Sequence, residues 1–355
     1  MPNFIFLRFF SFVCKNMKIK SPLTDKKEVE SLVEAGADEF FCGIEPIEWR
    51  RKFRDFSINQ RSTHANFTRL IDLEKAIIRA HSLKAKVHVA INAFFYSEEQ
   101  YKNAILIIKE VLRRGADGII FADLGLLINV PASLLQGKHT IIGTDMVIFN
   151  RQAASFCKRL GAKRIVIPRS ITIDELKDVV TNAGDMEYEV FIIHDLCFFE
   201  HGFCAYCKEA SGMPKKQARL RKKVYLFSAS RLMARGFEGG CRSRFSCLKV
   251  SLNTHKRIET MRNFHFWTNK HIDGCGACAL YDFKKLGIKA VKVLDRNFPT
   301  QEKIRATMFI RKSLDFLKDT QISKDDYMQK CRELFKKTFG SKCDKYDCYY
   351  PSVFR

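Results

Sequence analysis

Cysteines crowd one stretch of this chain, and their spacing suggests that they act as ligands. Seven of the thirteen cysteines fall within 82 residues: Cys197, Cys204, Cys207, Cys241, Cys247, Cys275 and Cys278. Thiolates are the ligands that iron–sulfur clusters prefer. Cys204-x-x-Cys207 and Cys275-x-x-Cys278 also have the spacing of zinc knuckles. The stretch therefore predicts a cluster or metal site, with reduced, unligated thiols as the other alternative.

Five further cysteines are expected to have no ligand role. Cys14, Cys157 and Cys331 are interpreted as helix or terminal residues. Cys343 and Cys348 lie in a C-terminal tail that we predict to be disordered. The alternative for these two is a tail that folds back onto the cysteine-rich stretch.

The cellular compartment bears on how these thiols are used. No apolar run reaches the roughly 18 residues that a membrane span needs, and no secretory signal is recognisable at the N-terminus. We therefore expect a cytoplasmic protein, in which thiols stay reduced and serve as ligands rather than disulfides. Residues 1–16 are interpreted as a disordered extension or a misplaced start, because Met17 opens a cleaner strand.

Positive charge is the second global feature. The formal net charge is +23, and such a field attracts nucleic acid. A basic stretch beside the cysteines is the expected RNA contact, through Lys215, Lys216, Arg219, Arg221, Lys222 and Lys223. The alternatives are a lysine-rich composition overall and, for this stretch, a solvated loop.

Short apolar strands alternate with amphipathic helices along most of the chain. Eight strands are predicted, at 18–23, 39–44, 86–92, 118–123, 139–144, 164–168, 188–194 and 290–294. Strand–helix alternation indicates a parallel sheet, and eight units favour a closed TIM-like (β/α)8 barrel in the α/β class. An open doubly wound sheet is the alternative, although no glycine-rich dinucleotide fingerprint follows a strand.

The domain organisation follows from this barrel. We expect the barrel over 17–300, a cysteine-rich insertion at 197–280 between strands 7 and 8, and a C-terminal helical tail at 301–355. Functional groups of such barrels lie where strands end. The catalytic candidates there are Glu45, Asn92, Asp123 and His194, and further polar residues at strand ends are Thr144, Asp145, Ser170 and Arg296. Each of them alone could instead be a loop cap.

Several short motifs, in order, resemble the U32 peptidase-like family. They cover residues 17 to about 300 and lie at 34–43, 122–125, 143–150, 161–170, 189–197, 240–242 and 286–296. The chain departs from the family pattern at Ser170, which replaces a glutamate, at His194, which is shifted by one position, and at Leu294-Asp295-Arg296. Cys207 and the Cys275–Cys278 pair are additional to a four-cysteine pattern.

The resemblance implies a fold, a cofactor and a reaction class. Family members were first described as collagenase-like proteases, and others are oxygen-independent hydroxylation proteins acting on ubiquinone precursors, transfer RNA or ribosomal RNA. It implies a 4Fe-4S cluster on Cys197, Cys204, Cys241 and Cys278, with Cys207, Cys247 and Cys275 as alternates. It also implies a small-molecule oxygen donor such as prephenate. Zinc remains the alternative to the cluster.

Three functions follow as hypotheses. The first is an iron–sulfur enzyme for oxygen-independent hydroxylation or a related modification, with RNA as a candidate substrate. The second is a peptidase, in which Cys197 would pair with His194 or His201; the sequence contains neither a nucleophile elbow nor a His-Glu-x-x-His helix. The third is a metal-stapled RNA-binding protein without catalysis.

Overall fold

The computed structural model describes the barrel and its C-terminal helices. The described residues are 17–53, 56–59, 65–181, 184–194, 274–294, 296–340, 343 and 348–354, with Gly202 and four short strand pieces at 245–246, 249–250, 257–258 and 263–264. The expected extension at 1–16 and the basic stretch at 214–223 lie outside them. Among the described residues, no helix is long and apolar enough to cross a membrane.

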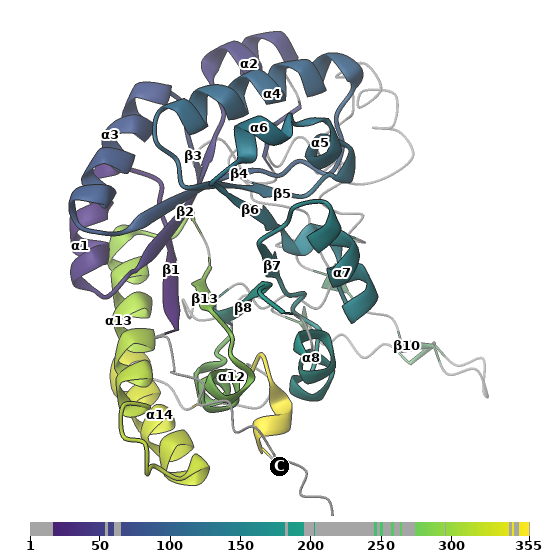
Figure 1. The fold of residues 1–355 in the computed structure, drawn as a ribbon. Coiled ribbons are helices and arrows are strands. Elements are labelled where there is room, and N and C mark those ends of the chain that lie inside the picture. Colours follow the sequence, from purple (N-terminus) through teal and green to yellow (C-terminus); the bar gives the residue numbers. More distant parts are fainter. Residues whose placement is uncertain are drawn as a thin grey trace, which may run out of the picture.

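Eight parallel strands close into a ring (Figure 1). Their order around the ring is β1-β13-β8-β7-β6-β5-β4-β2, and a β1–β2 pairing closes it. Because the ring closes, the predicted TIM-like barrel is confirmed and the open sheet is excluded. The strands are β1 (Lys18–Pro22), β2 (Glu39–Ile44), β4 (Lys86–Ile91), β5 (Gly118–Phe121), β6 (His139–Ile142), β7 (Arg164–Val166), β8 (Glu187–Ile193) and β13 (Ala290–Val293).

Helices surround the barrel, and the two-residue strand β3 (Asn66–Phe67) extends the sheet beside β2. The helices α13 and α14 pack against each other on the outside, and α13 also lies against β1. The helices are α1 (Val29–Glu34), α2 (Ile47–Phe53), α3 (Leu70–Ser82), α4 (Glu98–Arg113), α5 (Leu124–Asn129), α6 (Ala132–Leu135), α7 (Arg151–Arg159), α8 (Ile173–Val180), α12 (Leu280–Leu286), α13 (Thr300–Phe316) and α14 (Lys324–Phe339), with short 3-10 turns η1 (Lys26–Glu28), η3 (Thr144–Met146), η7 (Ala277–Ala279) and η9 (Pro351–Phe354).

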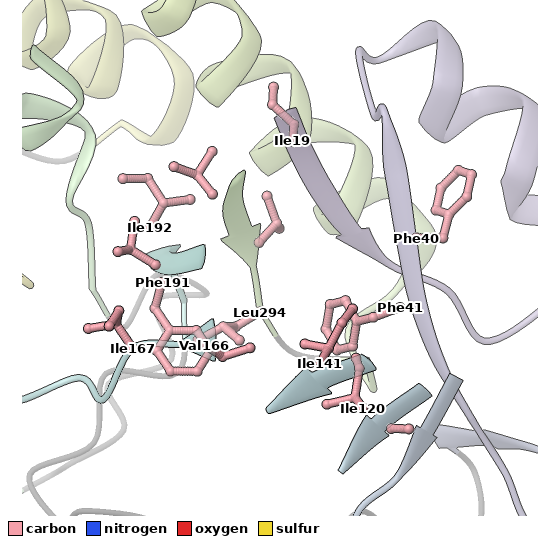
Figure 2. Close-up of a cluster of buried hydrophobic side chains, with 14 of the residues drawn as sticks. Ile19, Phe40, Phe41, Ile120, Ile141, Val166, Ile167, Phe191, Ile192 and Leu294 are labelled. Carbon is pink, nitrogen blue, oxygen red and sulfur yellow. The ribbon is translucent and has the colours of Figure 1, made fainter. Parts of the chain in front are cut away.

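Alternation along each strand separates two apolar layers. Figure 2 shows Phe40 and Phe41 on opposite sides of β2, with Phe41 near Ile120 of β5 and Ile141 of β6. Every residue of β2 is buried, as expected for a parallel strand that has the lumen on one face and helices on the other. Some of the helices begin at a side-chain cap: the hydroxyl of Ser97 accepts from Gln100 N in a capping box that opens α4.

The C-terminal segment returns to the barrel. Cys348 forms a parallel bridge with Cys275, and Tyr349 N donates to Cys275 O at 3.0 Å. The Tyr350 hydroxyl donates to Phe191 O at 3.1 Å, and the Tyr350 ring packs edge-on against Phe283. The expectation of a disordered tail is therefore wrong at Cys348, because backbone pairing and aromatic packing hold this segment against β8.

Candidate functional site at the barrel mouth

The described residues contain only part of the predicted ligand set. Cys197, Cys204, Cys207, Cys241 and Cys247 lie outside them, as do His201 and the six basic residues proposed to contact RNA. Cys275 and Cys278 are described, and both are buried. The position of these two can therefore be compared directly with the strand that leads to Cys197.

Cys275 lies against the end of β8. It forms an antiparallel bridge with Ile193. On either side of this bridge, His194 N donates to Gly274 O at 2.9 Å and Gly276 N donates to Ile192 O at 2.7 Å. Cys275 thus stands beside the point at which the chain leaves β8 and continues toward Cys197.

Cys278 contacts a different part of the molecule. It lies in η7, and its Sγ donates to Met328 O of α14 at 3.9 Å. The neighbouring Ala277 O accepts a hydrogen bond from the hydroxyl of Tyr327, at 3.0 Å. The one-turn spacing of the Cys-x-x-Cys pair therefore places Cys275 at the strand end and Cys278 against the outer helix.

The buried thiols are neutral as they stand. Burial raises the pKa of Cys275 well above its usual value and also raises that of Cys278. Burial likewise raises the pKa of Cys348 to about 12. A bound metal ion reverses this preference by displacing the thiol proton. Within the described parts of the chain, no three His, Cys, Asp or Glu side chains form a ready metal site, so these thiols do not make a complete site by themselves.

His194 ends β8 in a strained conformation. Its φ of +66° lies in the left-handed region that non-glycine residues rarely occupy. Its ring packs edge-on against Phe298 at 4.7 Å, and its carbonyl accepts a hydrogen bond from the Tyr349 hydroxyl. Strain of this kind persists only where surrounding contacts enforce it, and it is frequent at functional sites.

A network of buried charges occupies the lumen below the mouth. Glu189 on β8 is its centre: it accepts from Lys20 Nζ at 2.5 Å and from Arg164 Nη1 at 3.2 Å, and Lys292 Nζ lies 3.1 Å from its other oxygen. Arg164 also contacts Glu39 at 2.5 Å. Barrel interiors are usually filled by branched apolar residues, so this polar layer is a distinctive feature of the chain.

The network changes the titration of its members. Burial would raise the pKa of Glu189, but Lys20, Lys292 and Arg164 together hold it well below its usual value. Burial lowers the pKa of Lys20 to about 8 and also lowers that of Lys292. His88, fully buried on β4, has a pKa lowered well below its ordinary value by burial, and is neutral.

A second group of polar residues lies at the strand ends. Arg296 Nη1 donates to Asn66 Oδ1 at 2.9 Å, and Arg50 donates to Glu45 at 3.1 Å. Gly43 makes the first contact sterically feasible, because a Cβ there would stand 1.9 Å from Asn66 Oδ1 and 2.2 Å from Arg296 Nη1. Glu45, predicted from its place after β2, is therefore buried beside a guanidinium.

The other predicted strand-end residues have varied surroundings. Asp123 caps α5: it accepts from Leu126 N at 2.5 Å and from the Tyr101 hydroxyl at 2.8 Å. Asn92 follows β4, and its Oδ1 is buried without a hydrogen-bond partner among the described residues. Thr144 and Asp145 are buried in η3, whereas Ser170 is exposed.

Several buried residues were missed by the sequence reasoning. Arg169, next to the predicted Ser170, is buried and lies over the Phe191 ring at 4.8 Å. Lys292 and Glu189 face the lumen from the middle of apolar strands. A charged residue inside an otherwise apolar strand is the signal that could have identified them, because such a residue needs a buried partner.

Comparison with known proteins identifies the family to which the chain belongs. The sequence profile of peptidase family U32 matches residues 24–347, which includes all eight barrel strands except β1. The chain belongs to peptidase family U32. The resemblance inferred from short motifs is thereby confirmed, and the U32 assignment covers both the barrel and its C-terminal helices.

Curated relatives of this U32 protein match only part of it. The tRNA hydroxylation protein P of Escherichia coli is 25% identical over 188 residues, which are 53% of this chain and 38% of that protein. The tRNA hydroxylation protein P2 of Bacillus subtilis is 27% identical over 50% of this chain and 52% of its own length. An uncharacterized protease of Methanocaldococcus jannaschii is 26% identical over 53% of this chain and 43% of its own length. The chain thus spans about half or less of the length of these relatives.

Among solved structures, the U32 peptidase Mk0906 is similar to the chain. It superimposes with a TM-score of 0.43 and 13% identity, over 80% of this chain and 94% of that one.

Proposed function

We propose that this U32 barrel is the catalytic part of an enzyme that hydroxylates tRNA without molecular oxygen. The proposal is carried by the 188-residue similarity to the tRNA hydroxylation protein P of Escherichia coli, together with the similarity to the Bacillus subtilis protein P2. The buried polar residues at the strand ends, Glu45, Asp145 and Arg296, support it, because the active sites of such barrels lie at this end. The net charge of +23 suits a polyanionic substrate.

The proposed cofactor is a 4Fe-4S cluster held by Cys197, Cys204, Cys241 and one cysteine of the Cys275-x-x-Cys278 pair. The position of Cys275 beside the end of β8 favours Cys275 over Cys278 as the fourth ligand, because the chain leaves β8 there toward Cys197. Such a cluster supplies electron transfer. Soft thiol donors from separate chain segments fit it, and they also fit zinc.

Metal analysis distinguishes a 4Fe-4S cluster from a zinc ion. Anaerobically purified protein should be brown and contain about four irons per chain if the cluster is present. Colourless protein with one zinc per chain would identify a structural metal and remove the cluster from the proposal. Loss of bound metal in Cys275→Ser, with metal retained in Cys278→Ser, would assign the fourth ligand.

We also propose that the protein is located in the cytoplasm. The proposed RNA contact is the basic stretch from Lys215 to Lys223. Reversing the charges of Lys215, Lys216, Arg219, Arg221, Lys222 and Lys223 should weaken tRNA binding and flatten its dependence on salt concentration. A matched control reverses six exposed basic residues on the outer helices. Equal loss in both variants would mean that binding follows net charge rather than this stretch.

A peptidase is the second candidate, because a relative from Methanocaldococcus jannaschii is called a protease. A cysteine nucleophile works as a thiolate with a lowered pKa. Cys197, the predicted nucleophile, lies outside the described residues. His194, the predicted base, is buried against Phe298. The similarity to the tRNA hydroxylation proteins P and P2 favours the hydroxylation hypothesis.

The test of the function is nucleoside analysis of tRNA from a strain that lacks the gene. We expect one hydroxylated nucleoside to disappear and to return on complementation with the wild-type chain. An unchanged set of tRNA nucleosides would contradict the proposal. Cleavage of collagen-like peptides by iron-free protein would point to the peptidase.

A further inference from the structure

Gly202 lies in close contact with the turn η3, which follows β6. In the sequence it stands between the proposed ligands Cys197 and Cys204, and it is the residue of that interval that the structure describes. A Cβ added at Gly202 would stand 1.9 Å from Val147 Cγ2 and 2.4 Å from Asp145 O. Heavy atoms do not approach each other so closely, so the contact requires a residue without a side chain.

Val147 meets Gly202 from an unusual backbone conformation. Its φ of 55° and ψ of 58° are left-handed, which makes a β-branched residue a genuine outlier. Its backbone N–H donates to Thr144 O at 3.1 Å and so closes the turn. Strain of this kind persists only where the surrounding structure enforces it, and it is frequent at functional sites. The strained residue and the crowded glycine are in contact with each other.

The turn η3 is a firmly attached part of the barrel mouth. Thr144 and Asp145 are both buried. Gly143, which precedes the turn, donates from its backbone N–H to Phe121 O of β5 at 2.7 Å, and a Cβ at Gly143 would stand 2.8 Å from the same oxygen. A residue that packs against this turn, as Gly202 does, is therefore held at a defined place relative to the barrel strands.

His194 attaches the same part of the chain to a second place on the barrel. Its backbone N–H donates to Gly274 O at 2.9 Å, and its ring packs edge-on against Phe298 at 4.7 Å. His194 follows β8, whereas the turn that Gly202 contacts follows β6, and β7 lies between these two strands in the ring. The chain between His194 and Gly202 is thus attached to the mouth at both of its ends.

These two attachments limit where the proposed ligands can lie. Cys204 is two positions after Gly202, and two residues of extended chain span at most about 7 Å. Cys197 is three positions after His194, and three residues span at most about 11 Å. Cys275 is bridged to the strand end immediately before His194. Three of the four proposed thiolate ligands therefore depend on these two attachments.

We propose that Gly202 and Val147 are positioning residues, which hold the chain segment from Cys197 to Cys204 against η3 so that its thiolates can bind the cluster. Metal ligands must be fixed in place by the residues around them if the site is to retain its metal. This inference deepens the proposed function and rests on the cluster in that proposal. The contact between Gly202 and Val147 itself needs neither cluster nor RNA, so the two proposals can fail separately.

The first test crowds the contact. Gly202→Ala adds a Cβ that the space beside Val147 does not admit, so the segment must move away from η3. We expect the full-length variant, purified anaerobically, to hold less than half of the wild-type iron and to give an altered electron paramagnetic resonance spectrum after reduction. Gly125→Ala is the matched control, because a Cβ there would stand 2.4 Å from the Tyr101 hydroxyl, and it should keep its iron.

Wild-type iron with an unchanged spectrum in Gly202→Ala, or an equal loss of iron in Gly125→Ala, would overturn the proposal. Val147→Ala covers the case in which Gly202→Ala does not fold, since it removes the contact without adding an atom. It should release iron to a chelator several-fold faster than wild type, and an unchanged rate would overturn the proposal. Combined with Gly202→Ala, it frees part of the space and should restore part of the lost iron, which a general folding defect would not allow.

Hydrogen exchange in the metal-free chain separates this inference from the proposed function. The peptide that contains Gly202 should exchange faster in Val147→Ala than in wild type, whereas a peptide that contains Gly125 should not change. This result in a protein that binds zinc, or no metal, would retain the contact and reject the cluster. Equal exchange at Gly202 in the two proteins would overturn the contact, whichever metal the chain binds.

Discussion

The hydroxyl of Tyr349 donates a hydrogen bond to the backbone carbonyl of His194 and so joins the C-terminal segment to the last residues of β8. His194, with φ +66°, directly follows β8 and precedes Cys197 by three positions in the sequence. The same segment pairs Cys348 with Cys275. The C-terminal segment therefore braces the backbone on which the proposed cluster ligands depend.

Tyr349→Phe should weaken the attachment of the C-terminal segment to His194, because it removes this hydroxyl. Loss of this buried hydrogen bond to His194 O is expected to cost about 0.5–1.5 kcal/mol of unfolding free energy. Hydrogen exchange at the amides of His194 and Gly276 should accelerate before global unfolding. Tyr350→Phe is the matched control, because its hydroxyl serves Phe191 O, further from the strand end. Equal exchange in the two variants would contradict a special role for Tyr349.

Glu189→Gln should be among the most destabilising substitutions in the barrel. It removes the charge that compensates Lys20, Lys292 and Arg164 in a fully buried position. Breaking a buried ion-pair network from one side costs about 3–5 kcal/mol, which urea unfolding would measure. Glu187→Gln is the control, since Glu187 is 31% exposed at its side chain and pairs with Arg164. A smaller loss in Glu189→Gln than in the control would contradict the network.

The buried thiol of Cys42 should make the free energy of unfolding depend on pH. Burial raises the pKa of its thiol from 9.0 to about 12. The folded state therefore holds a proton that the unfolded state releases, so the contribution is complete below pH 9 and is lost as pH rises from about 9 to about 12. Wild type should lose stability relative to Cys42→Ala between pH 8 and pH 10.5. A constant difference in unfolding free energy across this range would refute the assignment.

Gly43→Ala should separate Arg296 from Asn66. The added Cβ would stand within 2.2 Å of both side chains, so one of them must move. We expect loss of the proposed tRNA hydroxylation, with a cost of about 1–3 kcal/mol in unfolding free energy. A double-mutant cycle of Asn66→Ala with Arg296→Lys measures the contact directly. Full activity in Gly43→Ala would show that the Arg296–Asn66 contact is dispensable.

Much of the barrel could be predicted from the sequence. Alternating apolar strands and helices located all eight strands of the ring, because strand and helix periods differ and glycines such as Gly36 mark helix ends. Strand ends then pointed to Glu45, Asn92 and His194, since parallel strands end on the same edge. The family resemblance followed from short motifs between residues 34 and 296, one of which includes His194.

The lumen network and the tail could not be predicted in the same way. Lys20, Arg164 and Glu189 meet only because ring closure and strand register bring them together across 169 and 25 positions of sequence. The bridge between Cys275 and Cys348 likewise depends on tertiary contacts of Tyr349 and Tyr350. Spacing alone also could not tell which cysteine of Cys275-x-x-Cys278 faces the strand end.

Hydroxylated nucleosides in tRNA from complemented deletion strains are the most direct measurement. The wild-type chain and Cys278→Ser should restore the nucleoside, whereas Cys275→Ser should not, because Cys275 is the proposed ligand beside β8. Restoration by Cys275→Ser would contradict Cys275 as the fourth ligand, and an unchanged nucleoside in the uncomplemented deletion strain would contradict the proposed tRNA hydroxylation.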